Sequence, residues 1–301
     1  MEVISPISGK KTWTRKCAPA LLSPFTAGQR PKKRKNEVRF NPLRPVDPSQ
    51  TMVLMQWVSS EGEPKTIRGG TSDLSRDFFQ TLIQTGEWLS NEHTDEILYH
   101  YRKRLDKYRD IFPQNVAILS DLFAQQLMGN FLQYKKEGLE KFELDADLLE
   151  FVKGRKLQRG RPWKKCKALY VPLNVKGCHW VALFIDIVKC QITIFDSDVA
   201  ATTKEEMGEH VRPFCAMLPL VLRMTNKFKH LGQHLTKAWT WRRPRNMCTQ
   251  THRSGDCGMY MLRMIEFHMM GLSLKEVLTN ESMEYHRMQY AVELFNGSFD
   301  P

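Results

Sequence analysis

The clearest hydrophobic pattern lies in the middle of the chain, where three segments have the composition of β-strands. Residues 168–175, 179–188 and 191–196 are rich in Val, Ile, Leu and aromatic side chains. The second segment is apolar on both faces, which is typical of a central strand, and the third alternates between apolar and polar positions. Only Lys189 and Cys190 separate these two segments. The pattern therefore predicts an antiparallel hairpin.

Apolar residues recur at helical spacing on both sides of these strands. The spacing predicts helices over residues 88–108, 114–134, 204–225 and 257–270, and one or two more over 273–295. Pro213 and Pro219 are expected to interrupt the third helix, and Gly271 to end the fourth. An apolar run at residues 51–58 predicts one further strand. Because helices, strands and helices follow one another without an internal repeat, the sequence predicts an α+β fold.

Charge is distributed unevenly along the 301 residues. The net charge is +12, and residues 1–50 hold eleven Lys or Arg, three acidic residues and seven prolines. This segment has no apolar period, so we expect a disordered basic tail, with residues 51–301 forming one globular domain. Within the tail, the basic run Lys32, Lys33, Arg34 and Lys35 is of the nuclear-import type. It predicts a nuclear location, with the cytoplasm as the alternative.

The seven cysteines are scattered, and none forms a C-x-x-C pair. An odd number without a regular spacing is no disulfide framework and is typical of a reducing compartment. The chain has no apolar run long enough to span a bilayer, so we expect a soluble protein without membrane contact. Nothing in the sequence indicates an oligomer, and we expect a monomer.

One cysteine stands out by its surroundings. Cys257 lies between Asp256 and Gly258 and opens the predicted helix over 257–270. The N–H groups and the dipole at a helix N-terminus favour a thiolate, which is the nucleophile of covalent cysteine catalysis. The flanking glycines leave the backbone open to a substrate. The alternative is a buried cysteine that packs like a small hydrophobic residue.

The predicted hairpin supplies partners for this thiol. His179 begins one strand and Asp196 ends the next, so an antiparallel hairpin brings the two residues side by side. The imidazole can accept the Cys257 proton while Asp196 orients it. Gln250, seven positions before Cys257, can donate its amide to an oxyanion beside the Cys257 N–H. Taken singly, His179 is better explained as a strand-end histidine and Asp196 as a turn residue, and Gln250 equally well as a loop residue, whereas the three placements of Cys257, His179 and Asp196 together favour catalysis.

Together these motifs resemble a known family. His179-Trp180, Phe195-Asp196-Ser197, and Gln250 followed by Gly255-Asp256-Cys257-Gly258, resemble the SUMO- and ubiquitin-like-protein-specific cysteine proteases, which are related to the adenovirus-type endopeptidases. Residues 88–93, which begin with Trp88-Leu89, look like the motif that starts the catalytic domain of this family. The resemblance covers residues 70–296 and is closest to plant-type members.

The resemblance implies a papain-like α+β domain with a central, mostly antiparallel sheet flanked by helices. It implies that Cys257 is the nucleophile, His179 the general base and acid, Asp196 its orienting group and Gln250 the oxyanion donor. Trp88 and Trp180 would flank a tunnel that admits only the Gly-Gly tail of a ubiquitin-like protein, SUMO above all. The expected activity is precursor processing or deconjugation, and it needs no metal or other cofactor.

Two departures from the family pattern concern the partner and the oxyanion donor. The family commonly has an acid three residues after the first Trp, where this chain has Asn91 followed by Glu92. The interval from Gln250 to Cys257 is one residue longer than usual. Plant chains of this kind often belong to transposon-associated sets. The alternative to an enzyme is therefore a catalytically degenerate protease fold that binds a ubiquitin-like protein or nucleic acid.

Two other classes of function remain open from the residues alone. A zinc site would use His230, His234, Cys248 and His252, whose pairs have i, i+4 spacing. The Glu of a hydrolytic zinc motif and any C-x-x-C are missing, which argues against this site.

The second class is nucleic-acid binding, through the basic tail, the basic loop 153–167 with Trp163, and the basic segment 239–245 with Trp239 and Trp241. Since no nucleic-acid-binding motif accompanies these residues, we expect at most a weak, salt-sensitive contact.

Overall fold

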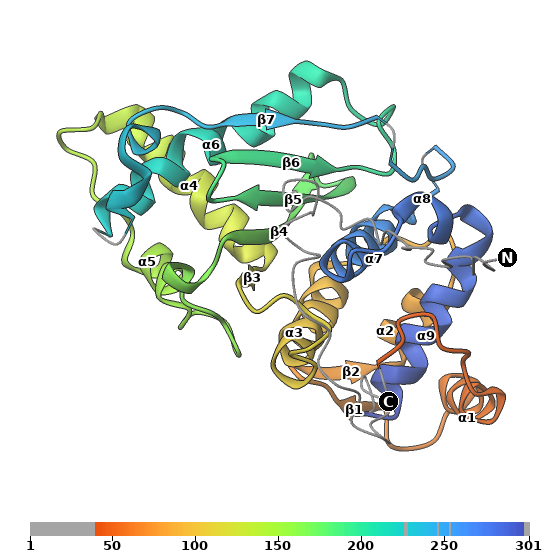
Figure 1. Ribbon diagram of the computed structural model, residues 1–301. Coiled ribbons are helices and arrows are strands. Elements are labelled where there is room, and N and C mark those ends of the chain that lie inside the picture. Colours follow the sequence, from red (N-terminus) through yellow and green to blue (C-terminus); the bar gives the residue numbers. More distant parts are fainter. Residues whose placement is uncertain (1–39, 226–227, 246, 253, 298–301) are drawn as a thin grey trace, which may run out of the picture. The chain divides into compact units, whose positions relative to one another are not determined.

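The computed structural model describes residues 40–225, 228–245, 247–252 and 254–297 (Figure 1). The helices and strands of these residues are, in chain order, α1 (Pro48–Ser59), β1 (Thr66–Arg68), β2 (Asp73–Ser75), α2 (Arg76–Ile83), α3 (Asn91–Lys107), β3 (Val116–Ile118), α4 (Asp121–Glu137), α5 (Ala146–Lys153), η2 (Trp163–Lys165), β4 (Ala168–Val175), β5 (His179–Asp186), β6 (Gln191–Phe195), α6 (Lys204–Met224), η3 (Lys229–Leu235), β7 (Thr240–Arg242), α7 (Cys257–Met270), α8 (Leu274–Val277), η4 (Asn280–Ser282) and α9 (Met283–Phe295). None of the helices in these ranges is both long and apolar enough to cross a membrane.

A mixed five-stranded sheet in the order β3-β4-β5-β6-β7 forms the centre of the fold. The three long middle strands run antiparallel, and the two short edge strands each pair parallel with their neighbour. The predicted hairpin is confirmed, because β5 pairs with β6 from Ala182 opposite Phe195 to Asp186 opposite Gln191. Asp196 therefore follows directly after β6, at the end of the sheet where β5 begins.

Each face of the sheet packs against its own set of helices. On one face Tyr170, Trp180 and Phe195 belong to a core shared with α1, α2, α3, α7 and α9. On the other face, the alternate strand residues contact a second core that includes α4, α5 and α6. Figure 1 shows α4 and α6 on one side of the sheet and α7 on the other. The strand β5 is apolar on both faces because each face is covered, as the sequence predicts.

One predicted element is wrong, and another begins later than expected. The run at 51–58 is not a strand but part of α1, which starts at Pro48 behind the N-cap Asp47. Only Leu54 and Val58, one turn apart, are buried in this helix, so its helical period is too weak to read from the sequence. The helix predicted over 114–134 is confirmed from Asp121 onward as α4, but residues 116–118 form β3, and Ser120 at the N-cap marks the boundary between them.

The prolines of α6 do not interrupt the helix. Pro219 has no N–H to donate to the Cys215 carbonyl one turn earlier. The backbone N–H of Trp239 donates to that carbonyl instead, over 2.9 Å. A contact from the chain after η3 therefore replaces the hydrogen bond that the proline removes, and α6 runs unbroken from Lys204 to Met224.

The folded region extends further toward the N-terminus than the sequence predicts. The sequence assigns residues 40–50 to a disordered tail, but the Phe40 ring is buried, with its centroid 5.1 Å from that of Tyr108. Arg44 forms an ion pair with Glu293 of α9 at 3.1 Å. Residues 40–50 therefore belong to the globular part. The rest of the predicted tail, with the basic run 32–35, lies outside the described residues.

Candidate active site

The candidate nucleophile Cys257 is the first residue of α7, as predicted. Its backbone N–H has no acceptor within the helix, and the positive end of the helix dipole lies at this position. The Sγ atom accepts a hydrogen bond from the backbone N–H of Trp180, with 3.4 Å between nitrogen and sulfur. Cys257 is only 3% exposed. These surroundings present positive partial charge to the sulfur.

The glycines on both sides of Cys257 are required by packing. Gly255 has a φ of +80°, and a Cβ there would lie 1.9 Å from the carbonyl oxygen of Gly86. A Cβ on Gly258 would lie 3.2 Å from the Trp180 ring and 3.1 Å from the Cβ of Leu89. The glycines thus let the start of α7 approach the segment that carries Trp88, rather than leaving the sulfur bare as the sequence suggests.

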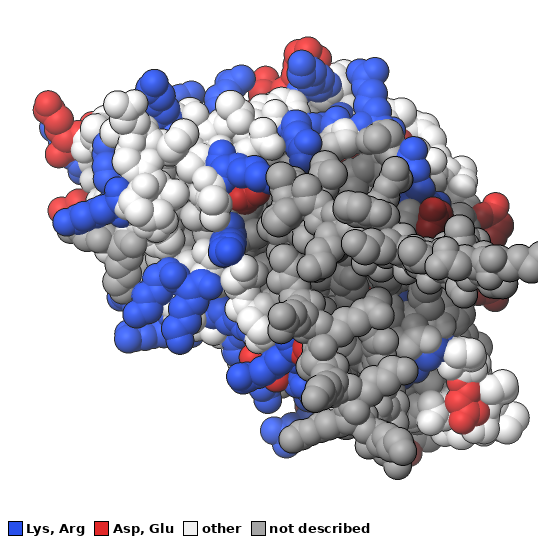
Figure 2. Space-filling model, viewed as in Figure 1, with Lys and Arg blue, Asp and Glu red and all other residues white. Residues whose placement is uncertain are grey.

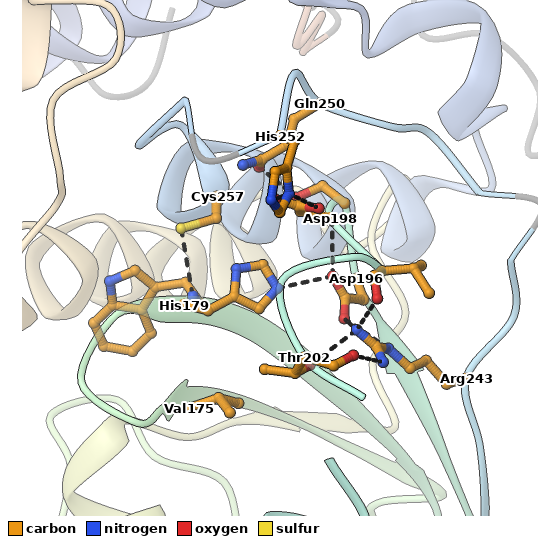
Figure 3. A network of polar contacts seen from close by, with 12 residues as sticks. Val175, His179, Asp196, Asp198, Thr202, Arg243, Gln250, His252 and Cys257 are labelled. Carbon is orange, nitrogen blue, oxygen red and sulfur yellow. Dashed lines mark hydrogen bonds and ion pairs between the residues drawn. The ribbon is translucent and has the colours of Figure 1, made fainter. Parts of the chain in front are cut away.

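The hairpin brings His179 and Asp196 together at the sulfur. The ring of His179 lies between Cys257 and Asp196 (Figure 3), and its Nε2 is 2.9 Å from Oδ1 of Asp196. Because Nε2 bonds to the carboxylate, Nδ1 is the nitrogen left for the sulfur. Burial lowers the pKa of His179, but the hydrogen bonds and charges of Asp196 and Cys257 outweigh it and raise the pKa to about 9. A protonated imidazole is therefore stable beside the sulfur at neutral pH.

Asp196 is held from its other side by Arg243, which follows β7. The Nε of Arg243 donates to Oδ2 of Asp196 over 2.7 Å, and both side chains are buried. The same guanidinium also donates to the carbonyl oxygens of Val199 and Thr202 (Figure 3). Burial raises the pKa of the Asp196 carboxyl, but His179 and Arg243 together lower it below its usual value. Asp196 is thus kept ionised and fixed in orientation.

Gln250 lies on the loop that leads into α7, and Ser197 orients its side chain. Ser197 Oγ donates to Gln250 Oε1 over 2.7 Å, and the Gln250 backbone N–H donates to the Ser197 carbonyl over 2.9 Å. Because Oε1 accepts this bond, the amide is assigned with its NH2 group available as a donor. In Figure 3 the Gln250 side chain points from its loop back over the site. The role of this amide as an oxyanion donor stays a prediction.

Trp88 and Trp180 lie face to face, and the tunnel that they are expected to flank stays a prediction. The rings of Trp88 and Trp180 are 5.9 Å apart between centroids, with an angle of 22° between their planes. Trp180 is buried and its Nε1 donates to the Leu89 carbonyl over 2.8 Å, whereas Trp88 is half-buried. At this spacing the rings are in aromatic contact. A peptide between them needs the rings to separate, and Trp88 is the ring with room to move.

The structure therefore brings together all six residues that the sequence places in the site outside the tail. Asn91, at the departure from the family pattern, donates to Asp121 at the start of α4 over 3.2 Å. Arg243 and the orienting hydroxyl of Ser197 are additions. The sequence offers no signal for Arg243, because it lies 47 positions from Asp196 and joins it only when β7 pairs with β6.

The zinc alternative finds no support in the described residues. Within residues 40–225, 228–245, 247–252 and 254–297, no three His, Cys, Asp or Glu side chains lie close enough to hold a metal ion. Cys248 is buried, and the His252 ring bonds to Asp198. The four proposed ligands do not converge.

The nucleic-acid alternative loses two of its three tryptophans. Trp163 is fully buried against Phe123, and Trp239 is buried with its Nε1 donating to the His234 carbonyl, so neither can stack on a base. Lys and Arg do predominate over the described part of the face in Figure 2, including the region of α5 and the loop after it. Several of these bases pair with nearby acids, as Lys156 does with Asp147. What remains is a basic surface and Trp241, which is half-buried and packs against the core beside α6.

Comparisons with known proteins agree with this geometry. A family model described as the Ulp1 protease family, C-terminal catalytic domain, matches residues 87–300. No curated protein sequence matches the chain.

Several solved structures share the fold. The C-terminal Ulp1 protease domain in complex with Smt3, the yeast ortholog of SUMO, is 16% identical, with a TM-score of 0.55 over 86% of this chain and 99% of that one. The catalytic domain of the Chaetomium thermophilum Ulp1-like SUMO protease is 14% identical, with a TM-score of 0.60 over 86% of this chain and 92% of that one. At these identities the likeness shows a shared fold.

Proposed function

The family model matches well over half of this chain, so the chain belongs to the Ulp1 protease family, and we propose that it is an active cysteine peptidase or isopeptidase. Its proposed substrate is a ubiquitin-like protein, SUMO above all, cleaved after the C-terminal Gly-Gly. One observation carries the proposal: Arg243, Asp196, His179 and Cys257 form a continuous chain of polar contacts that ends at a sulfur on a helix N-terminus. A degenerate protease fold would have no need to retain every link.

The reaction follows from these contacts. The Cys257 thiolate attacks the carbonyl carbon of the terminal glycine, and the negative charge moves to the carbonyl oxygen. The Cys257 backbone N–H and the Gln250 amide donate hydrogen bonds to that oxygen. The His179 imidazolium gives its proton to the leaving amine, and a thioester forms. His179 then takes a proton from water, the hydroxide displaces the sulfur, and the carboxylate product leaves.

The ring pair supports a Gly-Gly terminus as the substrate. Once Trp88 moves away from Trp180 and a peptide enters between the two nearly parallel rings, their flat faces would leave space for backbone alone. Glycine is the residue that presents only backbone to such walls. Rejection of every other residue near the scissile bond thus comes from exclusion rather than attraction.

SUMO is favoured over other ubiquitin-like proteins by the structural neighbours. One of them is described as a complex with Smt3 and another as a SUMO protease. The basic run at Lys32–Lys35 supports a nuclear place of action. The basic surface near α5 supports, at most, a secondary and salt-sensitive contact with nucleic acid.

Covalent capture tests this proposal. SUMO and ubiquitin, each carrying a C-terminal electrophile, are incubated with the full chain, and adducts are read by mass. The wild type is expected to gain the mass of one SUMO and to react far more slowly with ubiquitin. The Cys257→Ala protein is the matched control and should gain nothing. A wild type that reacts with neither probe, although it binds SUMO, would instead support the degenerate binding module.

A further inference from the structure

Three consecutive residues after β6 each hold a different part of the site. Asp196 bonds to His179, and Ser197 bonds to Gln250, as described above. Asp198, the third, contacts the ring of His252, with His252 Nδ1 2.9 Å from Oδ1 and 2.8 Å from Oδ2 of the carboxylate. The Asp198 backbone N–H in turn donates to Oδ1 of Asp196 over 2.9 Å. The segment 196–198 is thus a hub that joins the strand end to the loop before α7 (Figure 3).

His252 and Asp198 differ in how far their side chains are exposed to solvent. The Asp198 side chain is 5% exposed and that of His252 is 49% exposed. An exposed ion pair contributes little, because solvent screens it and both side chains lose freedom. Here one partner is already fixed and buried, so the ring is ordered against a rigid acceptor. The contact can therefore define where the loop lies.

In the described stretch 247–252, few hydrogen bonds besides that of His252 tie this loop to the sheet, although Met247 and Cys248 pack against the core. Besides the two bonds between Gln250 and Ser197, the Thr251 backbone N–H donates to Oδ1 of Asn280 over 2.8 Å, away from the sheet. Gln250 is a long side chain with three rotatable bonds, whereas an oxyanion donor has to lie within a few tenths of an ångström of its place.

We propose that His252 is a positioning residue, which holds the Gln250 loop against Asp198 so that the Gln250 amide is aimed at the developing oxyanion. The inference rests on the proposed peptidase function. The His252 ring acts on the transition state by placing Gln250, and it does not contact the substrate. Loss of the ring should therefore slow acyl transfer and leave substrate binding and the reactivity of the sulfur intact.

The test compares two reactions of the full chain. One is turnover of a SUMO with a fluorogenic amide at its C-terminus, which passes through an oxyanion. The other is capture by a SUMO carrying a C-terminal vinyl sulfone, in which the sulfur adds to carbon without a carbonyl oxygen becoming charged. For His252→Ala we expect kcat to fall about tenfold, with KM and the capture rate within about twofold of the wild type.

Two further variants make the result specific. His252→Asn places an amide N–H where the Nδ1 of the ring lies and should restore most of kcat. His234→Ala, which removes an exposed histidine from η3, should behave as the wild type. Turnover by His252→Ala equal to that of His234→Ala would overturn the positioning role, and so would an equal loss of turnover and capture. A wild type without turnover and capture would instead overturn the proposed function itself.

Discussion

This protein has two clusters of buried charged residues. In one, charged side chains pair with each other, and the other leads to the sulfur of Cys257. Between α3, α7 and α9, Arg104 pairs with Glu293 at 2.8 Å and Arg263 with Glu266 at 2.7 Å, and Arg104 also contacts Glu266. Each of the two glutamates in this cluster faces an arginine, so each negative charge has a positive partner close by. In the site, the contacts instead run in one line from Arg243 through Asp196 and His179 to the sulfur of Cys257.

Helix α7 takes part in both clusters, at different turns. Arg263 and Glu266 lie two turns after Cys257 on α7, and their cluster fixes this helix against its neighbours. The contacts from Arg243 through Asp196 and His179 to Cys257, called the open line below, reach the first turn of the same helix. They end at a sulfur atom that can form a new covalent bond. The cluster of Arg104, Arg263, Glu266 and Glu293, called the closed cluster below, is expected to contribute to stability alone, because removing one partner leaves a buried charge uncompensated. The open line is expected to contribute to chemistry.

The largest expected effect comes from breaking the open line. His179→Ala should lower turnover of a SUMO amide substrate by about 10⁴-fold or more, since the thiol loses its base and acid. The melting temperature should change little, because Asp196 keeps its ion pair with Arg243. Turnover and thermal unfolding, measured on the same preparation, check both parts. A variant that retains near-native turnover would show that His179 is not the base.

Breaking the closed cluster should do the reverse. Glu266→Ala leaves Arg263 without a carboxylate in a buried site and should lower the free energy of unfolding by about 3–5 kcal/mol. Denaturant unfolding measures the loss, and turnover per folded molecule should stay near the wild type. Glu276→Ala, on the exposed surface of α8, is the matched control. If both variants unfold alike, the closed cluster has no structural role.

The sequence predicts the open line better than the rest of the molecule, for a physical reason. His179 and Asp196 are joined by a short hairpin, which the local pattern predicts. The motifs around them resemble the family to which the family model assigns the chain. Arg243 meets Asp196 only through a parallel pairing of distant strands, which no local pattern encodes. The same limit explains α6, where the partner that allows Pro219 inside the helix lies at Trp239. In α1, capping by Asp47 and Pro48 decides against the strand that the apolar run suggests.

The central claim is that the imidazole and the sulfur share a proton, and NMR titration of His179 tests it most directly. Hydrogen bonds to Asp196 and Cys257 raise the pKa of His179 to about 9, against an ordinary value of 6.5. The imidazolium should therefore persist through neutral pH and be lost only as the pH rises through about 9, which also sets the alkaline limit of turnover. The account predicts a midpoint near 9 in the wild type and a lower midpoint in Cys257→Ala, whose sulfur is gone. A midpoint near 6.5 in both proteins would contradict it.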